Sequence, residues 1–128
     1  MKYYLHGKKI MRLVWVTARD LSTDLAATTE ISLCRTMASL GVEITLISPG
    51  NIDNEAFEHI EVRRLRLPGL NTLSGARDIR KRILVDSGLA DRADVVLVDW
   101  RYIKPLETDL RNLAVPWLVI DRGPPATS

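Results

Sequence analysis

Four short runs rich in apolar residues, separated by longer segments of different periodicity, most constrain how this chain folds. They occupy residues 13–16, 42–47, 93–99 and 116–120, and the third reads ADVVLVD. Short apolar runs bounded by polar or turn residues are typical of strands buried on both faces. Strands of that kind occur almost only in parallel sheets that helices cover on both sides. The pattern therefore predicts an α/β domain.

The segments between these runs have helical spacing. Residues 25–40 predict a helix that ends at Gly41. Its inward stripe is predicted at Ala26, Thr29, Leu33, Met37 and Leu40. Residues 74–87 predict a basic helix with Ala76, Ile79 and Ile83 inward and Arg77 and Lys81 outward. A short helical turn is predicted over residues 108–113.

A further strand is predicted from the apolar positions Ile60, Val62, Leu65 and Leu67. The adjacent Arg63 and Arg64 break its alternation and indicate a bulge or an exposed edge. The alternation of strands and helices predicts a Rossmann-like, three-layer α/β domain with a mainly parallel sheet.

We expect this domain to comprise residues 11–128 and to be incomplete at its carboxyl end, because the chain stops just past a buried strand. An uncovered parallel sheet favours a partner, a further domain or self-association. Residues 1–10 are polar and basic and precede Met11, so they are interpreted as an N-terminal extension or tag-like segment.

Composition excludes several classes of protein. The chain has 18 Lys and Arg residues and 16 Asp and Glu residues, a net charge of +2, which does not favour nucleic-acid binding. One cysteine, Cys34, and two histidines, His6 and His59, give neither a disulfide framework nor zinc-ligand spacing, so no metal site and no cofactor are predicted. No apolar run is long enough to cross a bilayer, which favours a protein that is cytoplasmic or, at most, peripheral at a membrane.

Charged residues follow the predicted strands at their carboxyl ends. Ligands of open parallel sheets bind at that edge. The candidate residues for binding sugar hydroxyls, a phosphate or a carboxylate are Arg19, Asp20, Asp99, Trp100, Arg101, Asp121 and Arg122. The alternative is that these charges pair with one another at the rim of the sheet.

A second group of candidates is basic. Arg63, Arg64, Arg66, Arg77, Arg80, Lys81 and Arg82 would form a positive face if their elements are adjacent. Such a face can contact anionic lipid head groups or a phosphate-bearing acceptor, and the alternative is an ordinary solvated surface.

Several motifs of established chemistry are absent. The segment TARDLSTDLAATTE contains no glycine, which excludes a GxGxxG loop and a P-loop there, and no GxSxG nucleophile elbow occurs. Cys34 is predicted to be a packed, unreactive thiol on the first helix.

The segment MRLVWVTARDLSTDLAATTEISLCRTMASLGVEITLISPGN resembles the opening of a family-four glycosyltransferase, and ADVVLVDW and VPWLVIDRGPP resemble later strands of the same domain. The resemblance implies the amino-terminal, acceptor-binding domain of a retaining, nucleotide-sugar-dependent enzyme of the GT-B fold. In that family a second domain, which carries paired glutamates, binds the donor, so this domain alone is expected not to turn over. The acceptor implied is a sugar or a lipid-linked molecule.

The sequence departs from the family pattern at three places. Asp24 and Leu25 stand where the family usually has a glycine pair, and Val42 stands where histidine is common. The histidine that the family usually has near the end of a later strand is absent, and Asp121 and Arg122 stand in that region. No catalytic role is therefore assigned to any residue.

Two alternatives come from other functional classes. One is a non-catalytic interaction module that meets a membrane surface or a protein partner through its arginines. The other is a receiver-like signalling domain, which requires an acidic pair after the first strand and a lysine after the last.

Overall fold

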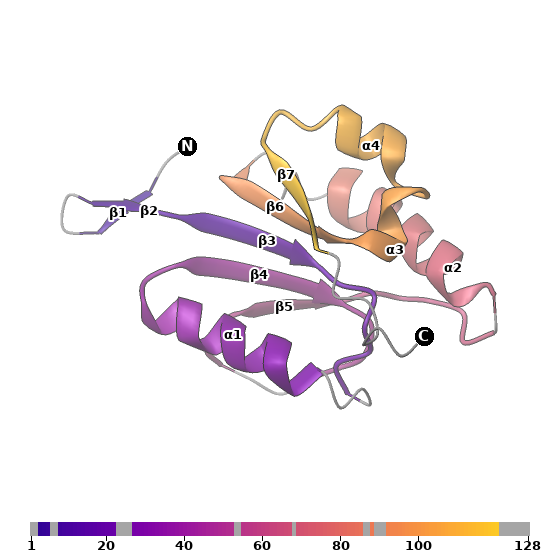
Figure 1. Ribbon diagram of the computed structural model, residues 1–128, viewed down its shortest axis with the longest axis horizontal. Coiled ribbons are helices and arrows are strands. Elements are labelled where there is room, and N and C mark those ends of the chain that lie inside the picture. Colours follow the sequence, from indigo (N-terminus) through magenta and orange to yellow (C-terminus); the bar gives the residue numbers. More distant parts are fainter. Residues whose placement is uncertain are drawn as a thin grey trace.

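A computed structural model describes residues 3–5, 8–22, 27–52, 55–67, 69–85, 88 and 92–120. Its centre is a five-stranded sheet in which every pair of neighbouring strands is parallel (Figure 1). The strands, in spatial order, are β5 (Glu58–Glu61), β4 (Glu43–Ser48), β3 (Arg12–Val16), β6 (Val95–Asp99) and β7 (Trp117–Ile120). The predicted Rossmann-like α/β class is confirmed.

The strand order places a switch point beside β3. The chain adds β4 and β5 on one side of β3 and then crosses to add β6 and β7 on the other. In a receiver-type sheet the first strand of the sheet lies between the second and the third. Here the first strand of the central sheet is β3, and it lies between the second, β4, and the fourth, β6. The receiver-like alternative is therefore wrong.

Helices cover both faces of the sheet (Figure 1). Along β3, Leu13 and Trp15 pack toward α1 (Ala27–Ser39), and Val14 and Val16 pack toward the helices on the opposite face. Those helices are α2 (Asn71–Asp78), α3 (Trp100–Ile103) and α4 (Glu107–Arg111). The two separate apolar clusters confirm the three predicted layers.

The inward stripe of α1 differs from the predicted one. Cys34 is fully buried, as expected, but Leu33 is 43% exposed and Leu40 is 78% exposed. Glu30, one turn before Cys34, is only 3% exposed. The helix turns this carboxylate inward because Thr17 and Arg19 meet it at the end of β3, an arrangement that apolar periodicity does not reveal.

The predicted strand through Leu67 ends earlier, so Arg63, Arg64, Arg66, Leu65 and Leu67 do not lie on a strand. Its last ladder-like bond joins the Val62 N–H to the Ser48 carbonyl, at 2.8 Å. Beyond it the chain runs beside α2 instead. The Arg63 N–H donates to Asp78 Oδ2 at 2.7 Å, and the Leu65 N–H donates to Ser74 Oγ at 2.9 Å. Side chains of α2 thus replace the carbonyls of β4, which ends at Ser48.

The predicted basic helix begins earlier than expected, as α2, and continues as a π-helical segment, η1 (Ile79–Val85). Ala76 and Ile79 are buried and Arg77 and Lys81 are exposed, as predicted, while the Ile83 side chain lies outside the described residues. The helical turn predicted at residues 108–113 corresponds to α4. Helix α3 was not predicted, because β6 passes into it without a loop.

Residues 1–10, which the sequence sets apart as an extension, contain a hairpin of β1 (Tyr3–Leu5) and β2 (Lys8–Ile10). These strands pair with each other and form a two-stranded sheet separate from the central one.

Candidate functional site

A polar cavity of about 270 Å³ lies at the carboxyl ends of the central strands. The segments after β3 and β5, the start of α2 and the helix α3 surround it. Its lining residues are Ala18, Arg64, Asn71, Thr72, Arg101 and Tyr102. The cavity therefore occupies the crevice beside the switch point, where open parallel sheets bind ligands.

Asp99 joins the two strands that flank the switch point. Its Oδ2 accepts the Ala18 N–H at 3.0 Å, and its Oδ1 accepts the Arg101 N–H at 2.9 Å. The second bond caps the start of α3. Both carboxylate oxygens thus accept backbone N–H groups, and Asp99 positions Ala18 and Arg101, two residues that line the cavity.

Arg101 and Trp100 follow directly on α3. The Arg101 guanidinium lies 3.6 Å from Asp99 Oδ2 and 5.5 Å from the centre of the Trp100 ring. The Arg101 side chain stays 30% exposed, and Trp100 is 45% exposed. Arg101 is therefore oriented by its neighbours and still accessible to an anion.

Asp20 holds a second guanidinium at the cavity. Its Oδ2 accepts a hydrogen bond from Arg64 at 2.8 Å, and its Oδ1 accepts the Ser22 N–H at 2.9 Å and the Ser22 hydroxyl at 2.5 Å. Burial raises the pKa of Asp20, but the bonds from Ser22 and the charge of Arg64 outweigh it and hold the pKa below its ordinary value. Asp20 is thus an ionised anchor for Arg64.

Arg19 turns away from this cavity toward α1. Its Nε lies 3.5 Å from Glu30 Oε1, and Thr17 Oγ1 lies at the same distance from that oxygen. The structure therefore separates the predicted cluster. Arg101 lines the cavity, Asp99 and Asp20 support it, and Arg19 pairs with a buried carboxylate.

Sequence reasoning missed Asn71, Thr72 and Tyr102 and placed Arg64 on an outer face. Tyr102 is 1% exposed, and burial raises the pKa of its hydroxyl above the ordinary value. Its hydroxyl lies 3.0 Å from where a side chain at Gly75 would begin, so α2 packs closely on α3. Gly75 is the sequence signal that points to this contact. A glycine inside a helix is unfavourable and usually has a packing reason.

An open, mainly apolar groove of about 650 Å³ adjoins the cavity and shares Thr72 and Arg101 with it. The other residues that line it are Leu73, Trp100, Ile103, Lys104, Pro105 and Glu107. A polar cavity and an apolar groove thus meet at Arg101.

The seven basic candidates do not act as one group. Arg64 points to Asp20, Arg80 Nε bonds Asp109 Oδ2 at 2.8 Å, and Arg82 bonds Asp78 Oδ2 at 2.8 Å. The hydrogen bond with Asp78 raises the pKa of Arg82. The exposed members are Arg63, Arg66, Arg77 and Lys81. Pairing within the domain, which neither the positive face nor the ordinary solvated surface considered from the sequence anticipates, accounts for Arg64, Arg80 and Arg82.

Three residues singled out in the sequence remain: Asp121, Arg122 and Cys34. Asp121 and Arg122 lie outside the described residues. Burial and the charge of Glu30 raise the pKa of the Cys34 thiol to about 12. Among the described residues, no cluster of His, Cys, Asp and Glu side chains is arranged to hold a metal ion, and no helix there is long and apolar enough to span a membrane.

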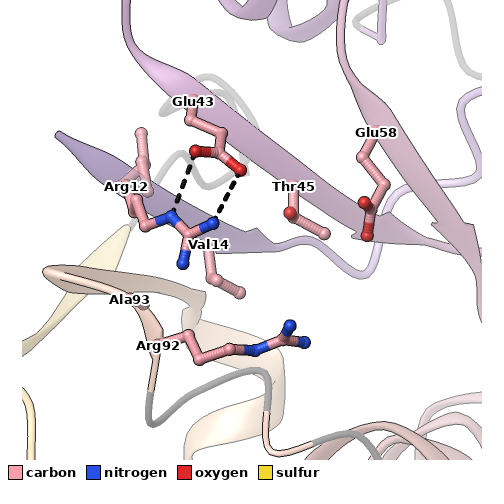
Figure 2. A pocket seen from close by; sticks show the side chains of 8 residues that line it. Arg12, Val14, Glu43, Thr45, Glu58, Arg92 and Ala93 are labelled. Carbon is pink, nitrogen blue, oxygen red and sulfur yellow. Dashed lines mark hydrogen bonds and ion pairs between the residues drawn. The ribbon is translucent and has the colours of Figure 1, made fainter. Parts of the chain in front are cut away.

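A smaller cavity, of about 70 Å³, lies at the opposite, amino ends of the strands. Figure 2 shows the Arg12 guanidinium facing the Glu43 carboxylate there, with Nε and a terminal nitrogen bonded at 3.0 and 3.1 Å. The Arg12 guanidinium and the Glu43 carboxylate thus form a two-point ion pair across the β3–β4 strand pair. The switch-point cavity remains the better candidate.

Comparison with known proteins adds evidence on the fold. No family model and no curated protein match the chain. Among solved structures, the chain is similar to a UGT transferase from Siraitia grosvenorii, solved in complex with UDP, with a TM-score of 0.55 and 14% identity. The match covers 86% of this chain and 27% of that one. The chain has the fold of one Rossmann-like half of a GT-B glycosyltransferase.

This match supports the GT-B resemblance seen in the sequence at the level of fold. The chain spans about a quarter of the matched enzyme's length, since 27% of it is covered. At 14% identity the match does not transfer substrate or residue roles.

Proposed function

We propose that this chain is the amino-terminal, acceptor-binding half of a nucleotide-sugar-dependent glycosyltransferase and that it is inactive without a donor-binding half. The observation that carries the proposal is a cavity at the switch point of a GT-B-like half domain, lined by two oriented guanidinium groups. The family resemblance adds that the enzyme retains anomeric configuration.

The cavity's chemistry favours an anionic group in the acceptor. Arg64 and Arg101 supply charge-assisted donors, and Thr72 supplies a hydroxyl beside them. Because the apolar groove begins at Arg101, a molecule with its phosphate or carboxylate at the guanidiniums can lay a nonpolar chain along Leu73 and Ile103. The acceptor class we propose is therefore an anionic amphiphile.

An acceptor half should not recognise the nucleotide. We expect the chain to bind UDP no more tightly than inorganic pyrophosphate, because both present the same charged group and only UDP adds a uridine. Isothermal titration of the two compounds measures the difference directly. Binding of UDP at least tenfold tighter than pyrophosphate would show that this chain is the donor half and would overturn the proposal.

An amphiphilic acceptor should bind more tightly as its chain lengthens. Across a series of n-alkyl phosphates we expect affinity to rise about twofold per methylene, less than full burial gives because the groove is open. Arg101→Ala should weaken binding of every member about tenfold or more, since a hydrogen bond to a charged group is lost. The substitution keeps the backbone N–H that Asp99 accepts, so α3 keeps its cap.

Two variants serve as controls for this series. Arg35→Ala removes an exposed arginine from α1, on the other face of the sheet, and should leave binding unchanged. Leu73→Ala should flatten the dependence on chain length while leaving the affinity for inorganic phosphate intact. Equal affinity across the series, or equal effects of Arg101→Ala and Arg35→Ala, would refute the assignment of this cavity.

A further inference from the structure

The segment that connects β5 to α2 and the helix itself have an unusual charge pattern. Residues 62–77 contain four arginines and no aspartate or glutamate. Four leucines lie between them in the sequence and all are exposed: Leu65 by 56%, Leu67 by 54%, Leu70 by 46% and Leu73 by 58%. Exposed apolar side chains that cluster with a single sign of charge mark an interaction surface.

These side chains gather on one part of the molecule. The segment runs beside α2, with Arg63 bonded through its N–H to Asp78 and Leu65 to Ser74, and the Leu70 N–H closes a turn on the Leu67 carbonyl at 3.0 Å. Val62 and Arg64 face inward, one buried and the other paired with Asp20. In Figure 1 the connection between β5 and α2 projects past the carboxyl ends of the strands.

The outward group is distinct from the arginines that the fold itself uses. We call the exposed set Arg63, Leu65, Arg66, Leu67, Leu70 and Arg77 the Arg/Leu surface. Arg66 and Arg77 have no ion-pair partner among the residues that the structure describes. Leu65 and Leu67 were expected inside a strand, and their exposure follows from the early end of β5.

The geometry points to a docking surface for an anionic lipid bilayer, formed by the Arg/Leu surface. Leucines of this exposure can enter the boundary between head groups and acyl chains, while the arginines meet lipid phosphates. A second copy of the chain is a poorer occupant, because two such surfaces would bring like charges together without a carboxylate.

The position of this surface gives docking a consequence. Leu73 and Trp100, which line the apolar groove, lie next to it along α2 and α3, and tryptophan is favoured at bilayer interfaces. A bound bilayer therefore faces the groove and the polar cavity. Docking itself does not depend on the proposed function, since it uses neither Arg101 nor Arg64.

Flotation with vesicles tests the surface. We expect the protein to float with vesicles of phosphatidylcholine and phosphatidylglycerol in equal amounts, and not with phosphatidylcholine alone. Binding should weaken strongly between 0.1 M and 1 M salt, as the screening length falls from about 10 Å to about 3 Å. Equal binding to both vesicles, or no binding to either, overturns the proposal.

Matched variants separate this surface from general charge. Replacing Arg63, Arg66 and Arg77 with glutamine should weaken partitioning on the order of a hundredfold, at roughly fivefold per arginine. The control removes the same charge elsewhere, through Arg35→Gln, Arg92→Gln and Arg111→Gln. Equal losses for the two triple variants would show that net charge, and not this surface, drives binding.

The leucines have their own control. A triple variant of the surface should weaken partitioning on the order of tenfold; it combines Leu65→Ser, Leu67→Ser and Leu70→Ser. A control triple variant at exposed leucines elsewhere should not weaken it; it combines Leu33→Ser, Leu40→Ser and Leu118→Ser. Leu73 is left in place, so binding of alkyl phosphates in the groove should survive, and its survival distinguishes failure of docking from failure of the acceptor site. If the leucine variant instead converts an oligomer to a monomer in size-exclusion chromatography without lipid, the occupant is a second copy and the bilayer proposal is wrong.

Discussion

Replacing Trp15 with alanine is expected to lower the free energy of unfolding by about 3–5 kcal/mol, the range for removing a large aromatic side chain from a packed core. Trp15 is 2% exposed and lies on the central strand β3, opposite Leu46 of β4 and Leu97 of β6. Its ring belongs to the apolar cluster that joins the sheet to α1. Because a domain is stable by only about 5–15 kcal/mol, urea denaturation followed by circular dichroism should show a large shift in midpoint.

The matched control is the same substitution at Trp100. That ring is 45% exposed and its centre lies 5.5 Å from the Arg101 guanidinium, so Trp100→Ala should change the free energy of unfolding by less than about 1 kcal/mol. A loss at Trp100 as large as that at Trp15 would mean that α3 and the groove contribute to the core more than their exposure indicates.

The central sheet was predictable because its signal is local. Each strand that is buried on both faces must be apolar at consecutive positions, and the runs around Trp15 and Val96 meet that requirement without reference to any other residue. The same reasoning failed at Leu65, since an alternation of leucine and arginine looks like a strand until the chain leaves the sheet. The side chains of Ser74 and Asp78, on a helix further along the chain, decide that departure.

The candidate site was predictable only in part. The carboxyl ends of β3 and β6 follow from the strand positions, so Arg101, which lines the cavity, and Asp99, which bonds its N–H, could be placed at that edge of the sheet. The pairing of Asp20 with Arg64 joins residues 44 positions apart and depends on where the chain turns after β5. Glu30 was missed for a related reason. A carboxylate is buried only where a cation pairs with it, and the cation here, Arg19, comes from a different part of the chain.

Gly50→Ala is expected to lower the free energy of unfolding by about 2–5 kcal/mol. Gly50 has a φ of +80°, where an L side chain costs about 1–2 kcal/mol. A Cβ there would overlap the Asp20 carboxylate and lie 2.9 Å from Ser22 Oγ, and overpacking adds about 1–3 kcal/mol. Asp20 cannot easily retreat, because Ser22 and Arg64 hold both of its oxygens. The alkyl-phosphate affinity should fall as well, since Arg64 loses its anchor.

Gly41→Ala separates backbone strain from the clash. Gly41 has a φ of +93° but open space around its Cβ position, so only the strain of about 1–2 kcal/mol is expected, with no change in phosphate affinity. Combining Gly50→Ala with Asp20→Ala should cost less than the sum of the single variants, because the overlapping carboxylate is gone. Strict additivity in this double-mutant cycle, or equal losses at Gly50 and Gly41, would show that the Asp20 carboxylate does not clash with a side chain at position 50.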